Sequence, residues 1–251
     1  MHHHFSANAL TTAQLAAWQA TSARPNAETL FDADAGTVAI GRHPDGGDAV
    51  LELYSPDGAT PATITGRAGS EIGTLLNTLW DAEHAATLVE PWTVDLHSAH
   101  TAHRPPKRHA DTMERAVELL NEARELVLAR VHDDVLQPTF EGYRPTADQP
   151  LVTLTLVGLT DLIKQDKRIR RELEAIARWA RRGGLSLRSV DRPDTSVPGP
   201  LGRTLANGSR IELLAGAGSS GQDQDLPGTG LLTLPFGEPV LFRTWPPMPG
   251  A

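Results

Sequence analysis

The stretch "GRAGSEIGT" (residues 66–74) decides which fold this sequence predicts. It follows the short β-branched run "ATIT" (62–65) and precedes the helix-like run "LLNTLWDAEHAA" (75–86). A strand, a glycine-containing turn and a helix in this order are typical of a phosphate-binding loop, G-x-x-x-x-G-K-[ST]. The stretch keeps the glycines Gly66 and Gly69 but has no lysine.

Strand-like and helix-like segments alternate along the chain around this loop. Strand-like segments cover 37–42, 49–54, 61–65, 91–96, 183–190, 210–215, 230–235 and 239–244, and helical spacing covers 11–23, 74–87, 111–131 and 164–182. The nearly unbroken apolar run "LVTLTLV" (151–157) is typical of a strand buried on both faces of a parallel sheet. The pattern predicts an α/β fold, with a mainly parallel sheet flanked by helices on both faces. We expect 151–157 to lie beside 61–65, with the loop at the C-terminal edge of both strands.

Composition narrows the classes of protein that fit. The 251 residues suffice for one α/β domain, and the absence of cysteine excludes disulfides and thiolate metal sites. No apolar run approaches the roughly 20 residues of a membrane span, so we expect a cytoplasmic protein. The net charge of −8 argues against a general affinity for nucleic acid.

One segment departs from this acidic balance. Residues 164–182 carry eight Lys or Arg against three Asp or Glu. The basic side chains that we expect to contact a polyanion or an acidic partner are Lys167, Arg168, Arg170 and Arg171. The alternative is a helix face that only meets solvent.

The order of the segments resembles the FtsK/SpoIIIE-like (FtsK/HerA-type) motor domains. These are the P-loop ATPases of DNA translocases, conjugative transfer proteins and type VII secretion motors such as EccC. The stretches that carry the resemblance are "AIGRHPDGGDAVLELY" (39–54), "TITGRAGSEIGTLL" (63–76), "WTVDL" (92–96), "PLVTLTLVGLTDLI" (150–163), "ARWARRGGLSLRSVDRP" (177–193) and "LPGTGLLTLPFGEPVLFR" (226–243). The resemblance covers about 37–244 and implies a RecA-like P-loop fold. It assigns 37–251 to the motor-like domain and leaves 1–36 as a tag remnant and a helical lead.

Within this resemblance, the loop lacks the groups that bind nucleotide. Counted from Gly66, the second glycine position holds Glu71, the lysine position Ile72 and the Ser/Thr position Gly73. A carboxylate at Glu71 repels phosphate, Ile72 cannot neutralise it, and Gly73 has no hydroxyl for Mg²⁺. Thr74 stands one residue late, about 100° further around the helix. Ser70, which precedes Glu71, also belongs to this loop, and we call the loop degenerate because it lacks these groups.

The second nucleotide motif of the family is also incomplete. Its acidic pair, which follows the apolar strand, falls here on Gly158 and Leu159. Without these acids, the Mg²⁺ shell lacks a ligand and no carboxylate orients the attacking water. The family's Gln-Arg-Pro is replaced by a triplet that begins with Asp191, which we take as a candidate sensor residue.

These departures predict a remnant of a phosphate loop, without a bound cofactor and without catalysis. We interpret the chain as a non-catalytic interaction or regulatory component of a DNA-transfer or secretion motor. The expected partner is a protein, either an active motor of the same kind or a second copy of the chain, and DNA is a further candidate. The alternative is an ATPase that uses unorthodox residues with Mg-ATP, or one that is completed by a neighbouring subunit.

Weaker patterns point elsewhere. The spacing of His97, His100 and His103 fits a metal, but nearby cations and two prolines favour a surface loop. "GAGSSG" (216–221) matches a dinucleotide motif, but no helical run follows it. "AIGRHPDGG" also resembles the start of forkhead-associated domains, which the strong helices contradict. Trp80 and Trp179 are expected to pack between helices and core.

Overall fold

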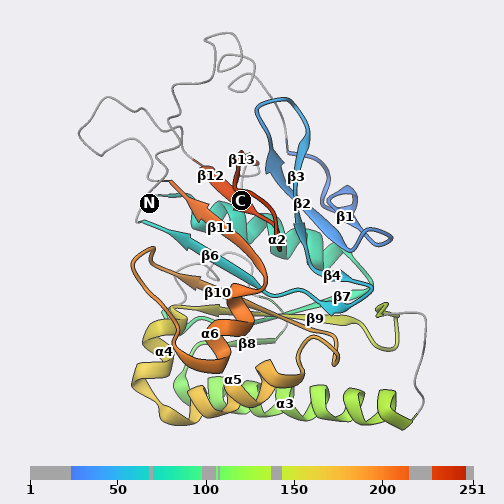
Figure 1. The fold of residues 1–251 in the computed structure, drawn as a ribbon, viewed down its shortest axis with the longest axis vertical. Helices are drawn as coiled ribbons and strands as arrows, with labels where there is room; N and C mark the ends of the chain where they lie inside the picture. The colour runs from blue at the N-terminus through green and yellow to red at the C-terminus, as the bar shows by residue number, and fades with distance from the viewer. Residues whose placement is uncertain are drawn as a thin grey trace.

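The computed structural model describes residues 24–67, 70–97, 106, 108–136, 143–214 and 228–246. Within these ranges the chain forms an 11-stranded mixed sheet with helices on both faces (Figure 1). This arrangement confirms the predicted α/β class. The predicted helix at 11–23, the possible tag at 1–5, Gly69, the histidines His100 and His103 and the motif at 216–221 lie outside the described residues.

The elements follow the predicted order with few additions. The helices are η2 (Ala27–Thr29, a 3-10 turn), α2 (Ile72–Ala85), α3 (Met113–Leu136), α4 (Leu159–Gln165), α5 (Lys167–Trp179) and α6 (Gly199–Ala206). The strands before α3 are β1 (Phe31–Asp32), β2 (Thr37–Arg42), β3 (Asp48–Glu52), β4 (Tyr54–Ser55), β5 (Gly58–Ala59), β6 (Ala62–Gly66), β7 (Val89–Val94) and β8 (Arg108–Ala110). The later strands are β9 (Leu151–Val157), β10 (Leu185–Asp191), β11 (Ser209–Leu213), β12 (Thr229–Thr233) and β13 (Val240–Thr244).

The order of strands in the sheet is β1-β2-β13-β12-β11-β6-β10-β9-β7-β8, with β3 also paired to β2. The strands from β11 to β8 run parallel, and the remaining pairs are antiparallel. Six of the seven residues of β9 are buried, so it is the central strand that its apolar sequence predicts. The expectation that β9 lies beside β6 is wrong, because β10 lies between them and pairs with both. A crossover connection can skip a position in a sheet, and the local sequence does not specify this.

Each face of the sheet has its own core. One core joins α2 to β2, β3, β6 and β11, with Leu75, Leu79 and Trp80 fully buried. The other joins α3 and α5 to the opposite face of β7, β9 and β10 (Figure 1). Alternate residues of β9 and β10 therefore face different helices, as strand geometry requires.

The predicted helix at 164–182 is divided in two. Asp166 has an extended backbone, with φ −139° and ψ 119°, and its carboxylate accepts a hydrogen bond from the N–H of Arg168 at 2.7 Å. This is an N-cap, which satisfies an amide that a new helix would leave unpaired. The cap ends α4 and begins α5.

Both ends of the described chain pack onto the same domain. Arg24 forms a salt bridge of 2.8 Å with Asp81 of α2, and β1 extends the sheet beyond β2. At the other end, the indole N–H of Trp245 donates to the carbonyl of Ala39 at 3.3 Å. None of the described helices combines the length and the apolar character that crossing a membrane requires.

Candidate functional site

The loop that follows β6 lies at the carboxyl edge of the parallel strands. β6 ends at Gly66, the N–H of Ser70 donates to the carbonyl of Arg67 at 3.0 Å, and α2 begins at Ile72. Parallel sheets place their ligand sites at this edge, where strands give way to helix N-termini. The described part of the loop therefore lies at the place where this kind of fold has its phosphate site.

Glu71 has a backbone that favours glycine. Its φ of 64° and ψ of 26° lie in the left-handed region, where a side chain other than that of glycine is strained. This is the position at which the phosphate-loop pattern has its second glycine. The backbone at this position is thus one that glycine adopts readily, whereas the side chain is that of glutamate.

The carboxylate of Glu71 is held at the start of α2. It accepts a hydrogen bond from the hydroxyl of Thr74 at 2.5 Å. A helix N-terminus favours negative charge, and this is where a phosphate loop receives its phosphate. A fixed carboxylate here supplies that charge from the protein itself and repels a second anion.

Two neighbours of Glu71 pack inward. The side chain of Ile72, at the lysine position, packs against the core formed by α2 and β6. Ser70 is buried, and a Cβ at Gly66 would collide with its hydroxyl oxygen. Within the described part of the chain, that oxygen has no hydrogen-bond partner. The loop is therefore folded onto its own strand, and Gly73 has no side-chain donor or metal ligand to add to it.

The end of β9 lacks the acids that a magnesium ion needs. Gly158 has a φ of 68°, its N–H donates to the carbonyl of Val190 at 2.8 Å, and Leu159 is fully buried. The first carboxylate after them is that of Asp161, on the exposed side of α4, within 3.8 Å of Lys164 and of Arg192. With Glu71 and Ile72 at the loop, these groups do not fit Mg-ATP.

Asp191 is at the same edge, at the end of β10. Its neighbour in β6 is Thr65, so β10 brings its carboxylate between the loop and the end of β9. The carboxylate accepts the N–H of Thr160 at 3.1 Å, at the start of α4. Burial raises the pKa of the Asp191 carboxyl above its ordinary value, and the Thr160 hydrogen bond opposes that shift. The candidate sensor residue is thus engaged with α4.

Most of the predicted basic contacts on α5 are paired with carboxylates. Arg168 makes three side-chain hydrogen bonds to the carboxylate of Asp166, from Nε to both oxygens at 3.2 and 3.0 Å and from Nη2 to Oδ2 at 2.7 Å. Arg170 lies 3.0 Å from Glu174. Arg171 lies 3.2 Å from Glu172. Lys167 is exposed, without an ion pair to the residues that the structure describes. The acids in these pairs are the three already counted in 164–182, so the net positive charge of the segment is unchanged, but most of its predicted contact residues are engaged with them.

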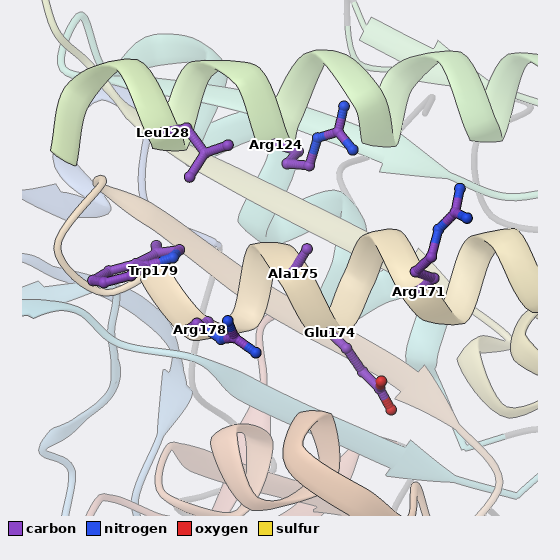
Figure 2. A pocket seen from close by; sticks show the side chains of 7 residues that line it. All are labelled: Arg124, Leu128, Arg171, Glu174, Ala175, Arg178 and Trp179. Atoms are coloured by element: carbon purple, nitrogen blue, oxygen red, sulfur yellow. The ribbon is translucent and has the colours of Figure 1, made fainter. Parts of the chain in front are cut away.

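A groove lies on the outer side of the α3–α5 pair. It has a volume of about 280 Å³ and is lined by Arg124, Leu128, Arg171, Glu174, Ala175, Arg178 and Trp179 (Figure 2). Leu128 on α3 and Trp179 at the end of α5 approach the groove from its two sides (Figure 2). Of the two expected environments, core or helix packing, Trp80 has the first, since it is buried in the core. Trp179 is outside the core, with 37% of its surface exposed, and lies at the groove between α3 and α5. Sequence periodicity did not identify this groove, because it depends on how two distant helices pair.

Metal binding has no support in the described residues. Across the ranges that the structure describes, His, Asp and Glu side chains nowhere gather in a group of three or more that could hold an ion.

Comparison with known proteins shows the fold. No protein-family model and no curated protein matches the sequence. The structure is similar to the pCW3 conjugation coupling protein TcpA, in its monomer form with ATPγS, at a TM-score of 0.65 and 15% identity. The match covers 89% of this chain and 71% of TcpA.

Two further ATPases give similar matches. ATPases 2 and 3 of EssC from Geobacillus thermodenitrificans match at a TM-score of 0.64 and 18% identity, over 91% of this chain and 47% of that one. The cytoplasmic domain of the Thermomonospora curvata type VII secretion ATPase EccC matches at 0.61 and 14%, over 88% of this chain and 28% of that one. The chain thus has the fold of FtsK/HerA-type ATPases across most of its length, and it spans less than half of these two proteins.

Proposed function

We propose that this chain is a catalytically degenerate P-loop domain of the FtsK type, a non-catalytic interaction or regulatory component of a DNA-transfer or secretion motor. The observation that carries the proposal is the Glu71 carboxylate, held by Thr74 at the N-terminus of α2. A phosphate loop binds through free amide groups and a lysine at this point. Here the point holds a negative charge, and the lysine position packs into the core.

A second motif supports the same conclusion independently. Phosphoryl transfer depends on positioning and on neutralising charge with Mg²⁺, and the metal needs acidic ligands at the end of the neighbouring strand. Gly158 and Leu159 supply none, and Asp161 is turned toward the surface cations Lys164 and Arg192. Hydrolysis needs both motifs, so restoring only one of them would not restore ATP hydrolysis.

The assignment of this chain to DNA transfer or secretion is based on the fold alone. Relatives in fold include a conjugation coupling protein and a type VII secretion ATPase. A fold is shared by many functions, so the site has to decide the role of this chain. A degenerate site in a motor fold favours a partner role beside an active motor, or in an assembly of this chain with itself. DNA is the second candidate partner, through the basic residues of α5.

The test is phosphate release from Mg-ATP by the purified chain, followed colorimetrically. We expect no turnover above background, and turnover near 1 s⁻¹, at the low end of ordinary enzyme rates, would overturn the proposal. Turnover that appears only on mixing with a motor whose own site has been inactivated would favour the alternative of an ATPase completed in trans.

A restored loop is the matched control. The triple variant Glu71→Gly, Ile72→Lys, Gly73→Thr returns the pattern G-x-x-x-x-G-K-T. We expect it to gain binding of a fluorescent ATP analogue without gaining hydrolysis, because the acids after β9 are still missing. Binding by the unaltered chain as tight as by the triple variant would contradict the role given to Glu71 and Ile72.

A further inference from the structure

Exposed large apolar side chains gather in two places on this molecule. Among the described residues they are Leu128, Trp179, Leu234, Phe236 and Val240. The first two line the groove between α3 and α5. The other three surround the turn between β12 and β13, which we call the apolar tip. Isolated exposed apolar residues are ordinary, but groups of them mark sites of association.

In the apolar tip, Phe236 has both an unfavourable backbone conformation and an apolar side chain that is exposed to water. Phe236 is fully exposed, at 103% of its reference surface, and its φ is 62°. The turn is closed by the N–H of Gly237, which donates to the carbonyl of Leu234 at 2.9 Å. Turns with a positive φ at their third residue normally place glycine there, and a bulky residue at that position is a true outlier. Within the isolated chain, nothing that the structure describes compensates for presenting this aromatic ring to water.

Charge at the two places is complementary. Glu238 is exposed two residues after Phe236, and Arg178 is exposed beside Trp179. Neither forms a salt bridge with any residue in the described ranges. The other charged residues at the groove are already paired: Arg124 and Arg171 with Glu172, and Glu174 with Arg170. Arg178 is therefore available to the carboxylate that accompanies the tip.

The tip and the groove of one copy are far apart. β12 and β13 lie in the upper half of the molecule, whereas α3 and α5 lie along its lower edge (Figure 1). Both sites are built on regular elements of one domain, so a single copy cannot join them. A contact between two different surfaces links copies head to tail, unless two copies exchange the contact reciprocally in a two-fold dimer.

We infer that the apolar tip of one copy docks into the groove of a second copy. Phe236 inserts between Leu128 and Trp179, and Glu238 of the same tip pairs with Arg178. An aromatic side chain that fills an apolar groove, with a charged pair at its border, is the usual composition of an interface centre. The inference concerns assembly alone and holds whether or not the chain hydrolyses ATP.

The test is the mass of the purified chain in solution, measured without nucleotide by sedimentation and light scattering over a range of concentrations. We expect the mass to rise with concentration, and Phe236→Gly to weaken this association by at least about tenfold. Glycine suits the positive φ at this position, so the variant should fold, which its thermal unfolding midpoint checks. An unaltered chain that is monomeric at every concentration, or a Phe236→Gly variant that associates normally, would overturn the inference.

Mixing two defective copies tests the head-to-tail geometry. Phe236→Gly keeps a functional groove, and Leu128→Glu keeps a functional tip, so each alone should be monomeric. A mixture should form a dimer and no larger species, because only one functional pair of surfaces remains. A mixture that stays monomeric excludes the proposed contact.

Charge exchange tests the pair. Arg178→Glu and Glu238→Arg should each weaken association, and both changes in one chain should restore it. Lys167→Glu, at the opposite end of α5, is the matched control and should leave the mass unchanged. Failure of the double exchange to restore association would refute the pairing of Glu238 with Arg178.

Discussion

The guanidinium of Arg188 on β10 donates a hydrogen bond to the carboxylate of Glu83 on α2, and both side chains are completely buried. The hydroxyl of Thr153 donates to the other carboxylate oxygen at 3.0 Å, and the guanidinium also donates to Thr155 at 3.3 Å. The pair thus connects α2, the helix that follows the loop after β6, to the strands β9 and β10.

Removing one member of this pair should destabilise the fold strongly. Glu83→Ala leaves the guanidinium of Arg188 buried without its partner, and such a change typically costs about 3–5 kcal/mol in the free energy of unfolding. Urea unfolding followed by circular dichroism measures the loss. The double variant Glu83→Leu, Arg188→Met removes both charges and should recover most of it. A single variant as stable as the unaltered chain would contradict the burial of the pair.

The backbone at Glu71 gives a second prediction. In an ordinary helix interior, glycine is less stable than alanine by up to about 1 kcal/mol. At Glu71 the order should reverse, with Glu71→Gly more stable than Glu71→Ala by about 1 kcal/mol, because the positive φ suits glycine. Both variants lose the bond to Thr74, so the comparison isolates the backbone. Equal stability of the two in urea would mean that this residue is not left-handed.

A third prediction concerns pH. Burial raises the folded-state pKa of Asp191 above the ordinary 3.8, so the folded state binds this proton more tightly than the unfolded state. The associated stability is present below that ordinary value and is lost as pH rises through the folded-state pKa. Asp191→Asn keeps an acceptor for the N–H of Thr160 but cannot titrate. The unaltered chain should therefore lose stability relative to the variant from pH 3.8 upward, until the difference becomes constant. A difference independent of pH would show that the carboxyl is not perturbed.

The basic helix gives a fourth prediction. Because Arg168, Arg170 and Arg171 each have a carboxylate within 3.2 Å, we expect weak binding of duplex DNA, measured by fluorescence anisotropy. Lys167→Glu with Arg168→Glu should change the affinity little at physiological salt. A loss of binding of about tenfold or more, with a reduced dependence on salt, would instead support contact with phosphates.

The sequence predicted the strands and helices better than their arrangement. The apolar run 151–157 became β9 with unchanged bounds, because burial on both faces leaves a clear mark on the residues. Helix α6 was not predicted, since its glycines and prolines, as in "VPGPLG" (197–202), favour a loop locally. The position of β10 between β6 and β9 was also missed, since it depends on long-range packing.

At the candidate site too, the sequence predicted residue identities but not their conformation and contacts. The missing lysine and acids could be read directly, because they depend on residue identity at fixed spacings. The left-handed backbone of Glu71 and its bond to Thr74 needed coordinates. The exposure of Trp179 could not be foreseen, because helical spacing alone does not tell which side the neighbouring helix covers.

The position of β6 between β10 and β11 also affects how the chain is made. Both partners of this strand lie far later in the sequence, so a nascent chain leaving the ribosome carries β6 with both edges unpaired until β10 has emerged, and with one edge unpaired until Leu213 has emerged. Pairings between distant segments form slowly, and unpaired apolar strands attract other chains meanwhile. The centre of the sheet can therefore close only after the segment up to Leu213 has been synthesised, and until then β6 stays exposed to pairing with other chains.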